Sequence, residues 1–167
     1  MVYVIARAAN AIPEFRQRIR EGGAVEHEIV HPASTIMAEG DLFTFCTFEY
    51  LEDFYLFAAR AAEQIACVKE DPTVENEVGR DDLLYMTAIP WVSFTSFMHP
   101  LLLNPADSVP RFAWGKFFEE GKLLKLPLSV HKHHGLVDGI HMGRLYAEVQ
   151  AYLDDPDSVL GEAKVVS

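Results

Sequence analysis

Two histidines and an aspartate lie close together near residue 135. His133 and His134 follow a strand-like run, and Asp138 comes four residues after the second histidine. A neutral imidazole can accept a proton near neutral pH because its ordinary pKa is about 6.5, and a nearby carboxylate can fix the geometry of such a site. The spacing therefore predicts a general base at His134 with Asp138 beside it.

The elements around these residues should place them at the junction of a strand and a helix. Residues 126–133 have the pattern of a strand, and Gly135 and Gly139 give the backbone freedom for a tight exit from it. Residues 140–153 repeat apolar side chains at helical spacing. Asp138 is therefore expected at or near the N-terminus of that helix.

These residues resemble the signature of the chloramphenicol acetyltransferase family. The similar motifs are His133-His134-x-x-x-Asp138-Gly139 and Ile140-His141-x-Gly143-Arg144. Further stretches resemble the family in order and at compatible spacings, namely Ile5 to Asn10, Pro13 to Arg16, His31-Pro32, Pro90 to Phe97, Gly115 to Gly121 and Leu126 to Leu128. The resemblance covers nearly the whole chain.

The resemblance implies acetyl transfer from acetyl-CoA, without a metal, to a hydroxyl of chloramphenicol or a similar small acceptor, and hence a role in antibiotic resistance. His134 would be the general base, and Ser96 would donate a hydrogen bond to the oxyanion of the intermediate. Asp138 would anchor the loop that places the histidine. Lys116 and Phe117 occupy positions at which the family contacts the phosphates and adenine of CoA.

The chain departs from the family pattern at several positions. Phe117 replaces a tyrosine, Ala113 replaces a frequent threonine, and Met98-His99-Pro100 replaces a polar continuation.

The first expected helix starts at Met1 without a capping residue, and the family carries several dozen further residues before it. We therefore expect a chain that lacks the N-terminal segment. The arginine that pairs with Asp138 in the family would be missing, which would leave a buried carboxylate unpaired. Arg144 is not expected to replace it.

Composition predicts one soluble cytoplasmic domain. The 167 residues fit a single domain, with a core at 1–155 and a tail at 156–167 that should fray. A net charge of −11 argues against nucleic acid and anionic membranes as partners, and there is no apolar run long enough to span a bilayer. Cys46 and Cys67 are the only cysteines, so a disulfide framework is not expected. Four lysines fall within one short segment, where they could receive an anionic ligand such as CoA or could line the solvent face of two strands: Lys116, Lys122, Lys125 and Lys132.

Apolar periodicity and turn residues predict an α+β fold, with helices packed on a mixed, mostly antiparallel sheet. Helices are expected at 1–20, with a break at Pro13, and at 51–69 and 140–153. Strands are expected at 25–30, 34–37, 42–48 and 83–97, and a hairpin at 111–118 and 122–133.

Three functional hypotheses follow. The first is an acetyltransferase which, as the resemblance implies, works as a homotrimer with each site at a subunit interface. The second is a catalytically impaired protein that still folds and oligomerises. The third is a metal hydrolase that uses His131, His133, His134, Asp138 and His141. The third is disfavoured because neighbouring residues of a strand point to opposite faces, which separates His134 from His131 and His133.

Overall fold

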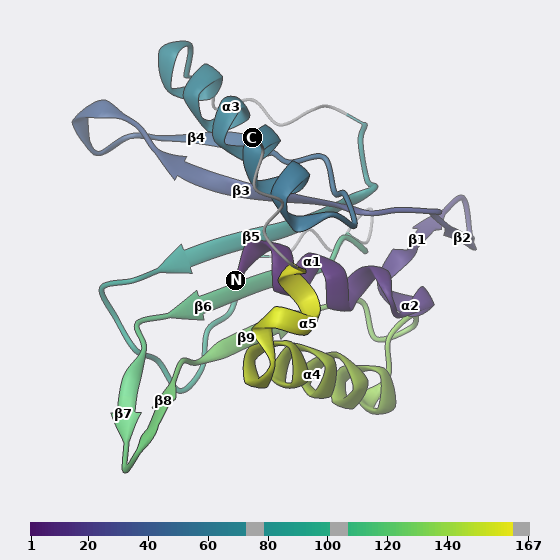
Figure 1. The fold of residues 1–167 in the computed structure, drawn as a ribbon. Coiled ribbons are helices and arrows are strands. Elements are labelled where there is room, and N and C mark those ends of the chain that lie inside the picture. Colours follow the sequence, from purple (N-terminus) through teal and green to yellow (C-terminus); the bar gives the residue numbers. More distant parts are fainter. Residues whose placement is uncertain (73–78, 101–106, 162–167) are drawn as a thin grey trace.

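A five-stranded sheet forms the centre of the molecule (Figure 1). The computed structural model of the chain describes residues 1–72, 79–100 and 107–161. The strand order is β4-β3-β5-β6-β9. β3 pairs in parallel with β5 and β5 with β6, whereas β3–β4 and β6–β9 are antiparallel. The strands are β3 (His31–Met37), β4 (Phe43–Thr47), β5 (Leu83–Ile89), β6 (Arg111–Gly115) and β9 (Leu128–His131).

Two short antiparallel ribbons extend from this sheet. They are β1 (Gln17–Arg20) with β2 (Gly23–Glu26), and β7 (Phe118–Glu120) with β8 (Leu123–Lys125). The second ribbon interrupts the hairpin that joins β6 to β9 and projects from one end of the sheet (Figure 1). The sequence correctly predicted an α+β fold with a mixed sheet, in which antiparallel pairs are the more numerous when the ribbons are included.

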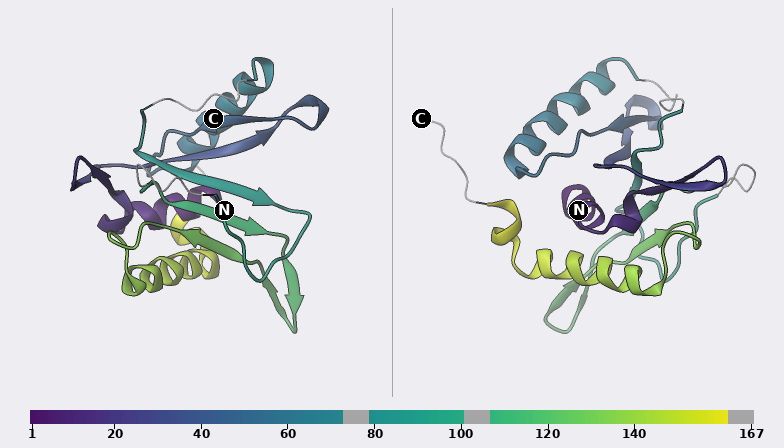
Figure 2. Two further views of the ribbon diagram at one scale, coloured as in Figure 1. Left: turned by 180° about the vertical axis from the view of Figure 1, so that it is seen from behind. Right: turned by 90° about the vertical axis from the view of Figure 1, so that its right-hand side faces the viewer.

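The helices cover one face of the sheet, so that a view from behind shows the strands in front of them (Figure 2). They are α1 (Val2–Asn10), α2 (Pro13–Arg16), α3 (Phe54–Glu70), α4 (Gly139–Asp154) and α5 (Pro156–Leu160), with a short 3₁₀ turn η1 (Glu39–Asp41). In the ranges that the structure describes, no helix combines the length and apolar character needed to cross a membrane.

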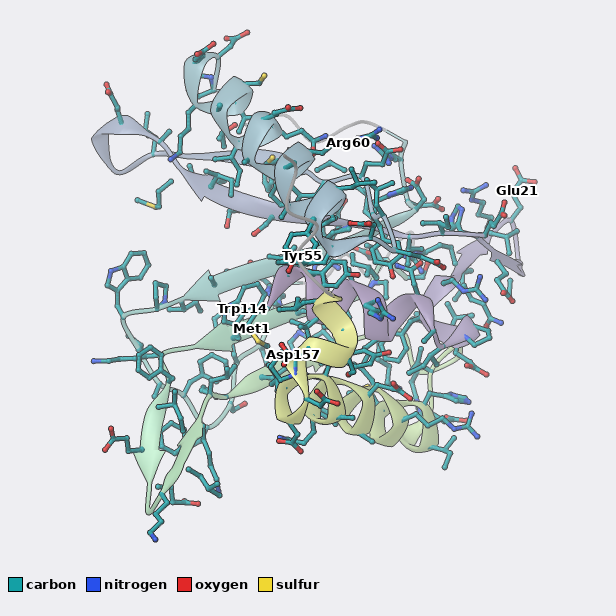
Figure 3. All side chains as sticks on the ribbon, viewed as in Figure 1. Met1, Glu21, Tyr55, Arg60, Trp114 and Asp157 are labelled. Atoms are coloured by element: carbon teal, nitrogen blue, oxygen red, sulfur yellow. The ribbon has the colours of Figure 1, made fainter. Side chains whose placement is uncertain are left out.

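The core lies between the sheet and α1, which α3 and α4 flank. Ile5 of α1, Leu84 of β5, Phe112 of β6 and Leu145 of α4 are fully buried in it. Met1 and Trp114, both labelled in Figure 3, pack against its edge. Burial of these side chains provides the main stabilisation of the fold, at roughly 25 cal/mol for each Å² of apolar surface removed from water.

A buried arginine ties the β1–β2 ribbon to the start of β5. The Arg18 side chain is fully buried, and its guanidinium donates to the carbonyls of Asp81 at 2.6 Å, Leu83 at 2.7 Å, Phe15 at 3.0 Å and Gln17 at 2.6 Å. Burial lowers its pKa to about 10, so it remains charged at neutral pH. Its four carbonyl partners satisfy a charge that would otherwise be costly to bury.

This contact explains one wrong prediction. Residues 17–20 were expected to continue the first helix, but they form β1, because the chain after Arg16 extends to place Arg18 beneath β5. Two other predictions were also wrong in part. Residues 27–30 lie outside β2, and the segment after Asp154 does not fray at once, since α5 buries Val159.

The Arg18 contact yields a stability test. We expect Arg18→Met to lower the free energy of unfolding by roughly 3 kcal/mol or more, because four carbonyls lose a charged donor. The matched control is Arg20→Met on the same strand, where the half-exposed side chain pairs with Asp81. Urea denaturation should show a small change for that control, and equal shifts of the two midpoints would contradict the assigned role of Arg18.

Candidate active site

A tight turn between β9 and α4 carries the predicted base. The backbone N–H groups of Leu136 and Val137 donate to the carbonyl of His133 at 3.0 and 3.2 Å. Gly135 approaches the His133 ring so closely that a Cβ there would lie 3.2 Å from it. Val137 is buried and anchors the turn in the core. The strand ends at His131 rather than at His133, so His134 lies in the turn just beyond it.

His134 points its ring toward solvent, with 83% of the side chain exposed. Its Nδ1 lies 3.4 Å from Oδ1 of Asp138 and 3.1 Å from Nζ of Lys132. The Lys132 ammonium also donates to the carbonyl of Val137. Within the described ranges, no protein group is bonded to Nε2 of His134, which leaves that nitrogen open to a substrate.

Asp138 begins α4 as predicted, but it is not buried. Its side chain is 65% exposed, and its backbone N–H donates to Nδ1 of His141 at 3.0 Å. The prediction that Asp138 is a buried carboxylate was therefore wrong, because the start of the helix holds this side chain in solvent. Among the described residues, the Asp138 carboxylate contacts the ring of His134 rather than Arg144.

The other histidines near the turn make structural contacts. His131 accepts at Nδ1 from the backbone N–H of His99 at 3.1 Å, and His133 accepts from that of Gly135 at 3.2 Å. His141 lies with Nε2 at 3.3 Å from Oε1 of Glu14. In the part of the chain that the structure describes, no three potential metal ligands form a group. The arrangement of these rings therefore gives the metal-hydrolase hypothesis no support.

Ser96 lies on a loop that packs against β9. Residues 83–97 were predicted as one strand, but β5 ends at Ile89, just before Pro90. The loop is bonded to β9 instead, because Ser129 donates its hydroxyl to the carbonyl of Phe97 at 2.9 Å. The exposed Ser96 helps to line a hollow of about 430 Å³, which we call the Ser96 hollow, together with residues 94–98 and 127–131 and Tyr146.

The structure does not bring every predicted residue to one place. His134 is not among the residues that line the Ser96 hollow, although His131, the last residue of β9, is. Oδ1 of Asp138 lies 3.4 Å from Nδ1 of His134. The described chain therefore presents two separate candidate groups, a histidine on a turn and a serine hydroxyl at a hollow.

The two predicted CoA-binding residues follow β6. Lys116 donates its backbone N–H to the carbonyl of Val92 at 2.8 Å, and the Phe117 side chain is exposed. Gly115 permits this approach, since a Cβ there would lie 2.6 Å from the carbonyl oxygen of Val92. Of the clustered lysines, Lys125 pairs with Glu120 on the projecting ribbon. The loop that carries Ser96 is thus joined directly to the predicted CoA-binding segment.

Sequence reasoning did not place His99 and Arg111 on the face of the sheet that lies opposite the helices. The His99 ring lies 5.5 Å from that of His131, and burial, followed by the charges of His131 and Arg111, lowers its pKa to about 4. Arg111 pairs with Asp107 at 2.5 Å and lies over the Tyr85 ring. Arg111, His99 and Tyr85 help to line a second hollow of about 240 Å³. The polar residues that alternate with apolar ones along β5 and β6 could have indicated this face.

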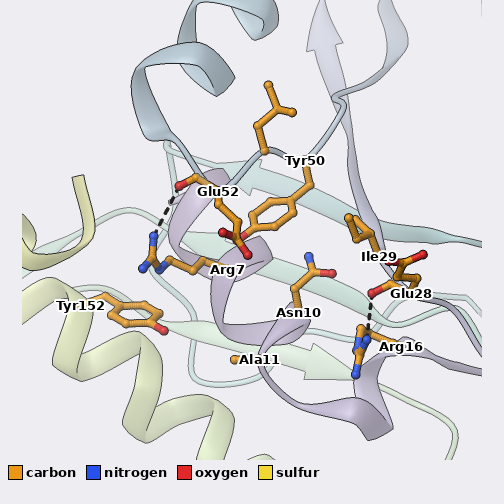
Figure 4. Close-up of a pocket in the computed structure, with 10 residues that line it drawn as sticks. Arg7, Asn10, Ala11, Arg16, Glu28, Ile29, Tyr50, Glu52 and Tyr152 are labelled. Atoms are coloured by element: carbon orange, nitrogen blue, oxygen red, sulfur yellow. Dashed lines mark hydrogen bonds between the residues drawn. The ribbon is translucent and has the colours of Figure 1, made fainter. Parts of the chain in front are cut away.

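A larger hollow of about 580 Å³ lies on the helical side, away from all predicted site residues (Figure 4). Arg7 and Arg16 reach it, but they donate to the carbonyls of Glu52 and Glu28. Asn10 forms two bonds of 2.9 Å with the backbone of Val30. These three side chains of the hollow therefore hold α1 and α2 to the neighbouring loops.

Comparison with known proteins identifies similar chains. Residues 1–150 match a family model described as chloramphenicol acetyltransferase. A protein of that name from Klebsiella sp is 33% identical over 155 residues, which cover 92% of this chain and 71% of the relative. Another, from Escherichia coli, is 34% identical over 159 residues with the same coverage of 92% and 71%.

Solved structures agree with the sequence matches. A chloramphenicol acetyltransferase superposes with a TM-score of 0.82 at 31% identity and covers 90% of this chain and 74% of its own. The dihydrolipoamide acetyltransferase of Azotobacter vinelandii, at 18% identity, has a TM-score of 0.65 over 95% of this chain and 69% of that one. The second likeness shows a shared fold.

The low pKa of His99 makes stability depend on pH. Because its folded-state pKa of about 4 lies below the ordinary value of 6.5, the unfolded chain binds this proton more readily. The contribution of His99 to the free energy of unfolding should therefore fall as the pH drops from 6.5 to about 4. We expect His99→Leu to flatten the urea midpoint over that range, whereas Phe97→Leu, a change in a neighbouring ring that does not titrate, keeps the slope. Identical slopes for wild type and His99→Leu would refute the assignment.

Proposed function

The chain belongs to the chloramphenicol acetyltransferase family and is an acyltransferase, and we propose that it transfers the acetyl group of acetyl-CoA to a hydroxyl of chloramphenicol or a similar small acceptor. One observation carries this proposal for the present residues. The ring of His134 is exposed beside Asp138, and its Nε2 is open to a substrate in the described structure.

In the proposed reaction, Nε2 of His134 removes the proton of the acceptor hydroxyl, and the oxygen attacks the thioester carbonyl. The tetrahedral intermediate then collapses, the carbon–sulfur bond breaks, and the imidazolium returns the proton to the sulfur of CoA. Asp138 accepts from Nδ1–H and so stabilises the imidazolium. The proton taken from the acceptor hydroxyl ends on the CoA sulfur, and no step needs an oxidant, a reductant or a metal.

Ser96 is proposed to donate its hydroxyl hydrogen to the oxyanion of the intermediate. In other enzymes the loss of one such donor raises the barrier by about 2.7–4 kcal/mol. The exposed hydroxyl at the Ser96 hollow supports this role, because a substrate can reach it. Ala113, which lies on the neighbouring strand and is fully buried, supplies no hydroxyl to assist it.

We propose a homotrimer in which His134 of one copy faces the Ser96 hollow of its neighbour. Two observations support this arrangement. His134 is exposed and lies outside the hollow of its own chain. Large apolar side chains are also exposed on the Ser96 loop and the β7–β8 ribbon, where a second copy could cover them: Trp91, Val92, Met98, Phe118, Leu123 and Leu124.

Acetyl-CoA is the proposed co-substrate, bound through Lys116 and Phe117. A lysine ammonium can pair with phosphate, and an exposed phenyl ring offers a face for the adenine. We further propose that residues 1–167 form one domain, whose core includes Val159 of α5 as well as residues 1–155. The free thiols of Cys46 and Cys67 support a reducing, cytoplasmic setting.

The test is release of CoA from acetyl-CoA by purified protein, with and without chloramphenicol. We expect acceptor-dependent release, and we expect His134→Ala to lower it by about 10²-fold or more, because the base is lost. The melting temperature should not change, since the ring is exposed. Near-normal turnover by the variant would remove His134 from the mechanism. Release by neither protein, with any small hydroxyl acceptor, would favour the catalytically impaired alternative.

A further inference from the structure

Two groups of opposite charge compete for one nitrogen of His134. Nδ1 lies 3.1 Å from the Lys132 ammonium and 3.4 Å from the Asp138 carboxylate. A lysine ammonium can only donate a hydrogen bond, and an ionised carboxylate can only accept one. Nδ1 of a neutral imidazole can therefore satisfy one of these neighbours at a time.

The choice between them decides which nitrogen carries the proton. If Lys132 donates to Nδ1, the imidazole proton is on Nε2, and Nε2 has no lone pair with which to act as a base. If Nδ1 donates to Asp138, Nε2 is free to accept a proton. The two neighbours thus stabilise tautomers with opposite capabilities.

We propose that Lys132 is a positioning residue that holds His134 in the tautomer unable to act as a base, in competition with Asp138. This inference rests on the proposed role of His134. The shorter of the two contacts is the one to Lys132, and its ammonium is also fixed by the carbonyl of Val137, whose side chain is buried in the core. Among the described residues, Lys132 has no carboxylate partner that would draw it away from the ring.

The same contacts predict the effect of removing the ammonium. Without it, the carboxylate of Asp138 is the remaining charged neighbour of Nδ1 among the residues that the structure describes, and a hydrogen bond to it requires a proton on Nδ1. The proton then moves from Nε2 to Nδ1, and the basic lone pair appears on Nε2. On an exposed ring, one hydrogen bond to a charged group changes the ratio of the two His134 tautomers by roughly three- to tenfold.

The direct test is nitrogen-15 NMR of protein labelled at histidine, recorded near pH 8.5, where an ordinary imidazole is neutral. The signals of His134 are identified by their loss in His134→Ala. Protonated and unprotonated ring nitrogens have well-separated shifts, so the spectrum reports the tautomer directly. We expect the proton mainly on Nε2 in the wild type and mainly on Nδ1 in Lys132→Met.

A matched control is Lys125→Met, which removes a lysine that pairs with Glu120 on the β7–β8 ribbon. It should leave the His134 tautomer as in the wild type. A wild-type ring already protonated on Nδ1, or a tautomer unchanged in Lys132→Met, would overturn the proposal. These spectra need no turnover, so they remain decisive even if the proposed reaction fails.

Steady-state kinetics separates a tautomer effect from simple support of the turn. We expect Lys132→Met to raise kcat roughly three- to tenfold, with the KM for acetyl-CoA unchanged, because more of the enzyme holds the basic tautomer. If Lys132 only held the turn through Val137, the variant would lose kcat and its tautomer would not move. A fall in kcat would therefore contradict the braking role.

Discussion

Side chains alternate along the strands, so that one face of the sheet packs beneath the helices and the other faces away from them, and this constraint organises the molecule. Along β5 and β6, Met86 and Phe112 enter the core with α1 and α4. Their neighbours Tyr85 and Arg111 point the other way and line a hollow. On β9 the same alternation places Val130 toward the core and Ser129 against the Ser96 loop. The position of the candidate site therefore follows from which face the helices cover.

Local periodicity predicted the elements whose structure depends on local sequence. The helices expected at 51–69 and 140–153 are α3 and α4, displaced by a few residues, because their apolar stripes pack on the sheet. The sequence could not show that Arg18 is buried under carbonyls of residues 81 and 83, far along the chain, and that this contact makes β1 a strand. It also could not show the parallel pairing of β3, β5 and β6, since parallel neighbours are brought together by tertiary contacts.

In the candidate site too, local sequence predicts some features, whereas others depend on contacts between distant segments. The motif around His134 and Asp138 is short, and the turn and helix start it predicts are present. The exposure of Asp138, the hydrogen bond between Ser129 and the Ser96 loop, and the position of His99 beside His131 all depend on packing between distant segments. Lys132 is close in sequence, yet its contact with Nδ1 depends on a turn that points residues 132 and 134 toward each other. The side-chain contacts at the site thus depend on tertiary packing, even where a short motif indicates the residues.

In the proposed homotrimer, a base on one copy and an oxyanion donor on the next form a single site. The most direct measurement is acetyl transfer by mixed oligomers assembled from His134→Ala and Ser96→Ala chains, each of which should be impaired alone, the second by roughly 10²–10³-fold. Sites that combine an intact His134 with an intact Ser96 from its neighbour should then form, and the mixture should regain activity well above the sum of the separate variants. Activity that never exceeds that sum, in mixtures shown to have exchanged subunits, would contradict a site shared between copies.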